Sequence, residues 1–297
     1  NWRGLYDLGL REIERLDGRE RRKRVGDVAR IGVERLGDVR GAIGLWNQAL
    51  EQHADDAEAL EELAALYKGD GQGGFTDVAR ARNLRRLTLP MGANYGDLDN
   101  DGFLDFYLGT GYPAYDGLIP NVLYWNRGGE RFLDVSAAAG VGHLQKGHGV
   151  AFGDLDEDGD LDLFEQMGGA YPGDGFGDVL FENPGSENRW LKLDLVGVRS
   201  NRSAIGTRVH AELVEDGKTR HLWRWVGSGG SFGCNGLRVH LGLGRAERVA
   251  KLEAYWPASD TTQTFTDVAA GGTLTIVEGA REYVRVERPA FRLGGAR

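Results

Sequence analysis

An Asp-rich segment of nine residues occurs twice in this chain, with an offset of 57 residues, and constrains the fold more than any other feature. The copies read Asp97-Leu-Asp-Asn-Asp-Gly-Phe-Leu-Asp105 and Asp154-Leu-Asp-Glu-Asp-Gly-Asp-Leu-Asp162. Carboxylates this close together repel one another unless a cation lies among them. Oxygen ligands in such number suit Ca²⁺, which takes about 6–8 of them in a flexible arrangement. Two copies in phase favour metal loops over solvated acidic turns.

The residues at odd positions of each loop are the candidate ligands, because the aspartate side chains there can converge on one point. Gly102 and Gly159, at the sixth position, permit the sharp turn that brings the last aspartate back. We therefore expect two Ca²⁺ sites, with these candidate ligands: Asp97, Asp99, Asp101, Phe103 and Asp105 in the first loop, and Asp154, Asp156, Asp158, Asp160 and Asp162 in the second.

The second loop also fits an EF-hand, because Glu165 falls at its twelfth position. The first loop has Leu108 there, and the Gly-rich segment 147–153 lacks the helical periodicity that an EF-hand needs. Short apolar runs with strand character follow both loops. We therefore interpret the loops as connections between strands, and Glu165 as a coincidence or, at most, a secondary ligand.

The repeat extends beyond the acidic loops at the same offset. Val122-Leu123 matches Val179-Leu180, and Phe75-Thr-Asp-Val78 matches Phe132-Leu-Asp-Val135. Each unit reads as four short strands separated by turn residues. That is the pattern of a propeller blade, whose neighbours bury their faces on one another.

Two segments, Tyr95–Asp105 and Phe152–Asp162, resemble the FG-GAP/VCBS repeats of integrin-type proteins. The resemblance implies a blade fold and Ca²⁺ ligation by the loop aspartates. No acidic loop occurs one period earlier, and two blades cannot close a ring. We therefore expect either a fragment of a longer protein or flanking domains that cover the open blade edges.

The first part of the chain predicts helices. Apolar residues from Ala42 to Leu50 recur at helical spacing, and a second such run extends through Tyr67. The segment resembles about one and a half tetratricopeptide repeats, which implies protein binding, and helices that cap the blade stack are the alternative. We expect Trp46 to be buried within this pair and an apolar face of 38–68 to pack against β structure.

From Trp190 the chain alternates apolar and polar residues in short segments separated by turn signals, which predicts an antiparallel sandwich or barrel. The expected strands are Trp190–Val196, Ile205–Val214, His221–Val226, Leu237–Leu243, Val249–Trp256 and Thr273–Val277.

Four segments of this region, in order, resemble ASPIC/UnbV domains, which commonly follow FG-GAP/VCBS repeats. They are Leu195–Val209, Gly227–Gly230, Leu241–Gly244 and Tyr255–Pro257. The fold class that we expect is therefore mainly β with an N-terminal α segment, with propeller-type blades followed by a small antiparallel β sandwich or barrel. The expected boundaries are 1–70 for the tetratricopeptide-like segment, 71–188 for the blades, 189–280 for the ASPIC/UnbV-like domain and 281–297 for a C-terminal tail.

Composition bounds the partners. The net charge of −9 does not suit nucleic-acid binding, and the basic run Arg19–Arg24 fits a solvated helix face. No apolar run reaches the roughly 18 residues of a membrane span. The lone Cys234 excludes an intrachain disulfide and a Cys-based zinc site. The chain begins at Asn1 without the apolar core of a signal peptide, and we expect a processed or truncated product.

No catalytic set stands out. His143, His148, Asp116 and Asp174 are the candidates for an enzyme site between the last blade and the C-terminal domain, although turn packing is the alternative for the two histidines. A deep polar pocket lined by His148 would favour an enzyme, whereas a shallow open surface would favour binding.

The function that the sequence favours is Ca²⁺-dependent binding or scaffolding, with a protein or glycan partner and as part of a larger chain or assembly. Ca²⁺ sites of extracellular modules work at about 10⁻⁴–10⁻³ M, which favours an extracytoplasmic location, secreted or periplasmic. Trp223 and Trp225 share one face of a strand and are either core residues or an aromatic ligand platform. The alternative function is an enzyme, plausibly of secondary metabolism.

Overall fold

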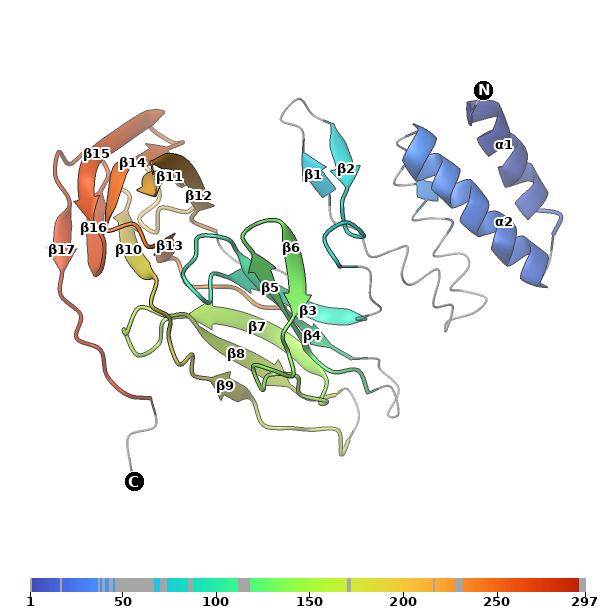
Figure 1. Cartoon of the computed structure of the whole chain (residues 1–297), viewed down its shortest axis with the longest axis horizontal. Helices are drawn as coiled ribbons and strands as arrows, with labels where there is room; N and C mark the ends of the chain where they lie inside the picture. Colours follow the sequence, from blue (N-terminus) through green and yellow to red (C-terminus); the bar gives the residue numbers. More distant parts are fainter. Residues whose placement is uncertain are drawn as a thin grey trace. The chain divides into compact units, whose positions relative to one another are not determined.

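The chain forms two compact units, Asn1–Leu87 and Thr88–Arg297, in a computed structural model. The structure describes residues 2–16, 18–36, 38, 41–42, 45, 67–69, 74–84, 88–111, 118–169, 172–215, 217–227 and 232–293. It is mainly β with helices near the N-terminus, as the sequence predicts (Figure 1). None of the described helices is long and apolar enough to cross a membrane.

Among its described residues, the N-terminal unit includes helices α1 and α2, a short π-helical turn and a hairpin. Their bounds are α1 Trp2–Ile13, α2 Gly18–Ile31, η1 Gly32–Leu36, β1 Tyr67–Gly69 and β2 Phe75–Asp77. Tyr6 and Ile13 of α1 pack with Val28 of α2 in a buried apolar cluster. Gly9 allows the close approach of the two helices, because a Cβ there would lie 2.3 Å from Val28. Lys23, within the basic run, is exposed on α2, as expected for a solvated helix face.

The helical pair expected between Ala42 and Tyr67 lies largely outside the described residues, and Trp46 with it. At its end the expectation is wrong, because Tyr67 begins β1. Tyr67–Gly69 pairs antiparallel with Phe75–Asp77 in a two-stranded sheet. Phe75–Asp77 therefore forms a hairpin strand, and among the described residues it does not join a blade. Helical spacing in a short run did not distinguish a helix from a strand that a hairpin partner stabilises.

The second unit begins with two blade-like sheets. The first has four antiparallel strands in sequence order, as expected: β3 Pro90–Gly96, β4 Asp105–Thr110, β5 Val122–Arg127 and β6 Arg131–Asp134. The second has three: β7 Gly147–Gly153, β8 Asp162–Met167 and β9 Val179–Phe181. Their shared core includes Tyr107 and Leu123 of the first blade and Phe152 and Leu163 of the second.

The repeat phase places a fourth strand of the second blade 57 residues after β6, at 188–191. The structure instead uses these residues for β10, Arg189–Val196, which pairs with strands of the C-terminal domain. Leu191 and Leu193 of β10 are fully buried in that domain. The second blade therefore ends at three strands because the chain leaves it for a deeper apolar core.

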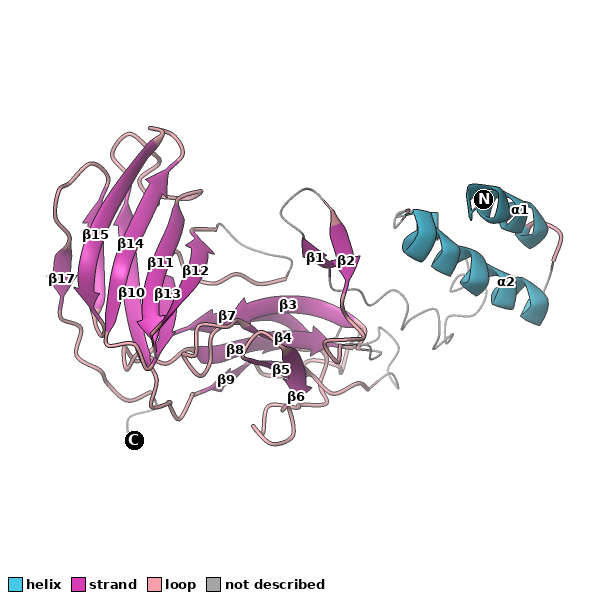
Figure 2. Cartoon of the chain, turned by 45° about the horizontal axis from the view of Figure 1, so that its top comes forward, coloured by secondary structure: helices cyan, strands magenta, loops and turns pink. Residues whose placement is uncertain are grey.

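The C-terminal domain is a sandwich of two four-stranded sheets. One has the order β13-β10-β16-β17 and the other β12-β11-β14-β15 (Figure 2). All strand pairs are antiparallel except β10 with β16, which are parallel. The remaining bounds are β11 Arg208–Glu215, β12 Lys218–Trp225, β13 Val239–Gly244, β14 Arg248–Trp256, β15 Thr261–Ala269, β16 Thr273–Val277 and β17 Val284–Val286.

Both sheets contribute to one apolar core. Leu241 and Leu274 face it from one sheet and Val209 and Leu252 from the other, all fully buried. The six expected strands are present, and β16 has the expected bounds. Two strands, β15 and β17, had not been expected. β17 pairs with β16 and so extends this domain into the segment taken as a C-terminal tail.

Asn235, in the loop before β13, forms hydrogen bonds with the first strand of both blades. The Asn235 amide oxygen accepts hydrogen bonds from the Phe152 N–H of β7 and from the Asn94 amide of β3, both at 2.8 Å. Its amide nitrogen donates to the Tyr95 carbonyl at 2.7 Å. Blades and sandwich are thus joined by hydrogen bonds from a single side chain.

Replacing Asn235 by Ala should destabilise the protein by roughly 2–4 kcal/mol, because three hydrogen bonds are lost, two of them partly buried. Urea denaturation followed by circular dichroism measures this change. The control is Asn201→Ala, which removes two hydrogen bonds within one exposed turn and should cost less. Equal losses in the two variants would contradict the fastening role.

Candidate metal centres

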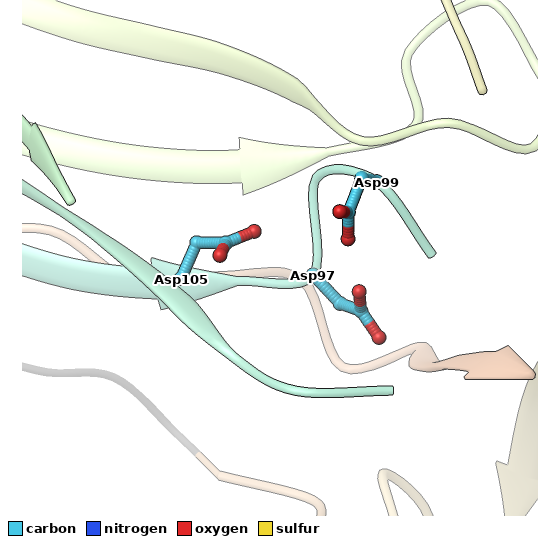
Figure 3. Close-up of side chains that lie close together, drawn as sticks. All are labelled: Asp97, Asp99 and Asp105. Atoms are coloured by element: carbon cyan, nitrogen blue, oxygen red, sulfur yellow. The ribbon is translucent and has the colours of Figure 1, made fainter. Parts of the chain in front are cut away.

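Each acidic loop connects the first two strands of a blade, as the strand interpretation predicts. In the first loop, carboxylate oxygens of Asp97, Asp99 and Asp105 lie within 4.8 Å of one another, and Figure 3 shows these side chains gathered at the turn. In the second loop the same limit holds for Asp154, Asp156 and Asp158. Both clusters could hold a metal ion.

The two loops share one hydrogen-bond pattern. The first aspartate accepts from the glycine N–H, Gly102 to Asp97 and Gly159 to Asp154, both at 3.0 Å. The aspartates at the third and fifth loop positions each accept a hydrogen bond from the backbone N–H two residues later, at 2.7–3.2 Å. The aspartate at the ninth position accepts from two N–H groups. One belongs to the residue at the second loop position, and the other to Asn126 on β5 or to Asn183 just after β9. These bonds orient the carboxylates before any ligand binds.

The glycine of each loop is required by both backbone and neighbours. Gly102 and Gly159 have φ of 94° and 101°, which favour glycine as the sequence predicts. A Cβ on Gly159 would lie 1.8 Å from the Trp190 ring, and one on Gly102 would lie 2.5 Å from the Arg220 guanidinium. The C-terminal domain therefore packs directly on both loops.

The remaining candidate ligands have additional partners. Asp160 Oδ1 accepts from the Asn100 amide at 2.8 Å and so links the second loop to the first. Asp162 takes the ninth-position role described above, and the ring of Phe103 lies beneath Arg220 at 5.5 Å. Glu165 is fully buried on β8 and its Oε2 lies 2.8 Å from the Tyr107 hydroxyl. It belongs to neither acidic cluster.

One buried oxygen in each loop fits a cation. Asp97 Oδ1 and Asp154 Oδ1 are buried and have no hydrogen-bond partner among the described residues. Buried polar atoms without partners are rare in folded proteins, and an ion is one explanation for them. The orphaned atom occurs at the same position of both loops, which supports a shared ligand over a local packing defect.

Burial raises the pKa values of several loop carboxylates. It raises the pKa of Asp97 to about 7, where Arg224 opposes the rise and Asp101 and Asp99 add to it. It raises the pKa of Asp105 to about 8, against two backbone N–H donors. In the second loop, burial and then Asp158 raise the pKa of Asp160 to about 6. The loops therefore resist full ionisation in the absence of a cation.

Two cations of the C-terminal domain contact the first aspartate of the loops, and the sequence analysis missed both. Arg224 of β12 lies 3.6 Å from Asp97. Lys192 of β10 lies 2.5 Å from Asp154 and 2.6 Å from Glu157, with its side chain only 1% exposed. Both residues lie more than 30 positions from their partners. The one available signal was a lysine between the apolar residues of a strand.

Each described member of the proposed catalytic set has a structural partner. Lys146 binds Asp174 at 2.5 Å, and His148 Nε2 lies 2.5 Å from the Gly168 carbonyl. The His143 ring packs on Phe176 at 5.1 Å, and Asp116 lies outside the described residues.

A cavity of about 630 Å³ lies between the blades and the sandwich. Asp97, Asp154, Cys234 and His240 are among its lining residues, whereas His143, His148 and Asp174 are not. The junction therefore contains a cavity, but His148, which the enzyme alternative places in its lining, does not line it.

Comparisons with known proteins support the two domain types. A family model described as ASPIC and UnbV matches residues 197–282, and one described as FG-GAP-like repeat matches residues 114–164, which include the second acidic loop. The first acidic loop is related to the second by repeat phase and shared hydrogen bonds. The two matched domains fit a binding or scaffold protein.

Cartilage acidic protein 1 is a curated relative of the chain. The proteins from Mus musculus and Homo sapiens are each 30% identical to it over 132 residues, which is 44% of this chain. The match covers 20% of the mouse protein and 19% of the human one, so the chain spans about a fifth of these relatives.

The metal-free protein should lose stability as the pH rises from about 7 to 8.5. Asp97 and Asp105 keep protons in the folded state that the unfolded chain releases near pH 4, so the free energy of unfolding falls as pH rises through their raised pKa values. His240, whose pKa burial lowers to about 3, acts in the opposite direction only below its unfolded value near 6.5.

Thermal melting of metal-stripped protein across this pH range measures the effect. Asp105→Asn removes one of the titrating groups and should flatten the decline. A melting temperature that rises with pH in the metal-stripped protein would contradict the assignment.

Proposed function

We propose that this chain is a Ca²⁺-stabilised binding or scaffold module with one ion in each acidic loop. The observation that carries the proposal is the buried, unpartnered Oδ1 of Asp97 and of Asp154 at equivalent positions of two matching loops. The candidate ligands are the odd-position residues of each loop. The ion would neutralise carboxylates that otherwise repel one another, and so hold each turn against the C-terminal domain.

The binding role rests on the domain types. FG-GAP-like and UnbV domains fit an integrin-like binding protein, and we propose a protein or glycan partner. The weak affinity typical of extracellular Ca²⁺ modules, about 10⁻⁴–10⁻³ M, and the similarity to cartilage acidic protein 1 support an extracytoplasmic location. The metal would serve structure, because both loops lie where the blades meet the sandwich.

Calorimetry should find two Ca²⁺ ions per chain, and one in each of the variants Asp99→Ala and Asp156→Ala. Chelation should lower the melting temperature, which Ca²⁺ should restore and Mg²⁺ should restore poorly. The control Asp267→Ala removes an exposed carboxylate outside the loops and should keep two ions. Two ions in either loop variant, or a melting curve unchanged by chelation, would refute the metal assignment.

Lys192→Met should strengthen Ca²⁺ binding at the second loop by about fivefold or more. The substitution keeps the length of the side chain but removes a charge 2.5 Å from Asp154, so the loop becomes more negative. Stability without Ca²⁺ should fall, because Asp154 and Glu157 lose their buried partner.

Lys146→Met is the matched control. Lys146 is also buried and binds Asp174 at 2.5 Å, but neither residue belongs to an acidic loop. It should lower stability without changing Ca²⁺ affinity. Titration calorimetry on both variants separates the charge effect from general destabilisation, and unchanged affinity in Lys192→Met would contradict it.

A further inference from the structure

The cavity between the blades and the sandwich has the size of a small-ligand site. Its volume of about 630 Å³ falls within the roughly 300–1,000 Å³ of such sites. Its wall includes the inner blade strands β3 and β7, the first aspartate of each loop, and the segment before β13. The proposed metal sites explain why the two aspartates lie there, but they do not explain the cavity beside them.

The polar lining of the cavity combines donors and acceptors. Arg224 and Arg238 provide guanidinium groups, and Asp194 provides a carboxylate. His240 Nε2 lies 2.6 Å from the Asn100 amide oxygen, whose amide nitrogen donates to Gly159 and Asp160. The imidazole therefore donates through Nε2.

Two buried polar atoms of lining residues lie beneath the cavity surface and lack partners in the described part of the chain. His240 Nδ1 remains an acceptor, and it has no hydrogen-bond partner among the described residues. The same holds for the Nε–H of Arg224, which is a donor. The polar groups that reach the cavity are the guanidinium donors and the Asp194 carboxylate, so a ligand that both donates and accepts hydrogen bonds matches this lining.

Several of the apolar residues that line the cavity are aromatic and exposed to solvent. Trp225 is 60% exposed, Tyr95 44% and Phe164 38%, and all three line the cavity. Large apolar side chains that gather at a cavity while exposed to solvent mark a binding surface. Trp223, on the same strand and also 60% exposed, does not line the cavity and stacks on His210 at 4.1 Å.

We propose that this cavity binds a saccharide unit of a glycan partner. Sugar hydroxyls donate and accept hydrogen bonds at once, and the C–H face of a pyranose ring packs on an aromatic ring such as Trp225. The proposal rests on the proposed binding function and specifies its partner class and its site. Asp97 and Asp154 belong to both the metal loops and the cavity wall, so saccharide binding depends on Ca²⁺.

A printed array of defined oligosaccharides, probed with the Ca²⁺-loaded chain at about 1 mM Ca²⁺, tests the proposal. We expect selective binding, lost in chelator. Calorimetry with the best-bound oligosaccharide should then show an affinity loss of about tenfold or more in Trp225→Ala, because aromatic stacking is removed. Trp223→Ala, matched in residue type, strand and exposure, should bind like the parent chain.

Tyr95→Ala is the second cavity variant, in case Trp225→Ala does not fold, and should also weaken binding. Equal losses in Trp223→Ala and Trp225→Ala would place the ligand on the outer sheet face and overturn the cavity site. Absence of binding to every oligosaccharide, or capture of a peptide in the cavity instead, would overturn the saccharide. Either result with two Ca²⁺ ions still bound would leave the proposed metal function intact, whereas loss of Ca²⁺ binding would remove both.

Discussion

The structure depends on how two dense groups of like charge are enclosed. Each loop places several carboxylates within a turn and buries the side chain of the first of them almost completely. Backbone N–H groups donate hydrogen bonds to these carboxylates, and one cation from the C-terminal domain lies beside each first aspartate. These partners leave one oxygen of each first aspartate unsatisfied. Without a further cation this oxygen has no partner among the described residues. The raised pKa of Asp97 reflects the unfavourable free energy of holding its charge in a buried position.

This enclosure places the two acidic loops at the junction between the blades and the sandwich. The Gly244 N–H donates to the Asn100 carbonyl and the Phe291 N–H to the Asp156 carbonyl, both at 2.8 Å. Trp190 and Arg220 lie against the glycines of the two loops. A change in loop geometry would therefore alter contacts with the sandwich directly. The blades and the ASPIC/UnbV-type domain behave as one body because their contacts are made at the most strongly charged points of the blades.

The sequence predicted what local pattern determines and missed what distant contacts determine. Loop positions and their left-handed glycines follow from nine residues, and the blade strands follow from the repeat. By contrast, β15 buries only Phe265 and Val268, so its sequence lacks the alternation of a half-buried strand. Lys192 and Arg224 meet the loops only after the sandwich has folded. The fourth strand of the second blade was lost because the sandwich core competes for the same residues.

The shared aspartates have a consequence for any ligand of the cavity. Asp97 and Asp154 face both the metal loops and the cavity, so ion and ligand cannot bind independently. Thermodynamic linkage makes the coupling reciprocal: an ion that improves ligand affinity is itself bound more tightly when the ligand is present. Arg224 lies between the two, beside Asp97 and in the cavity wall. Its guanidinium therefore contacts the first loop and lines the cavity.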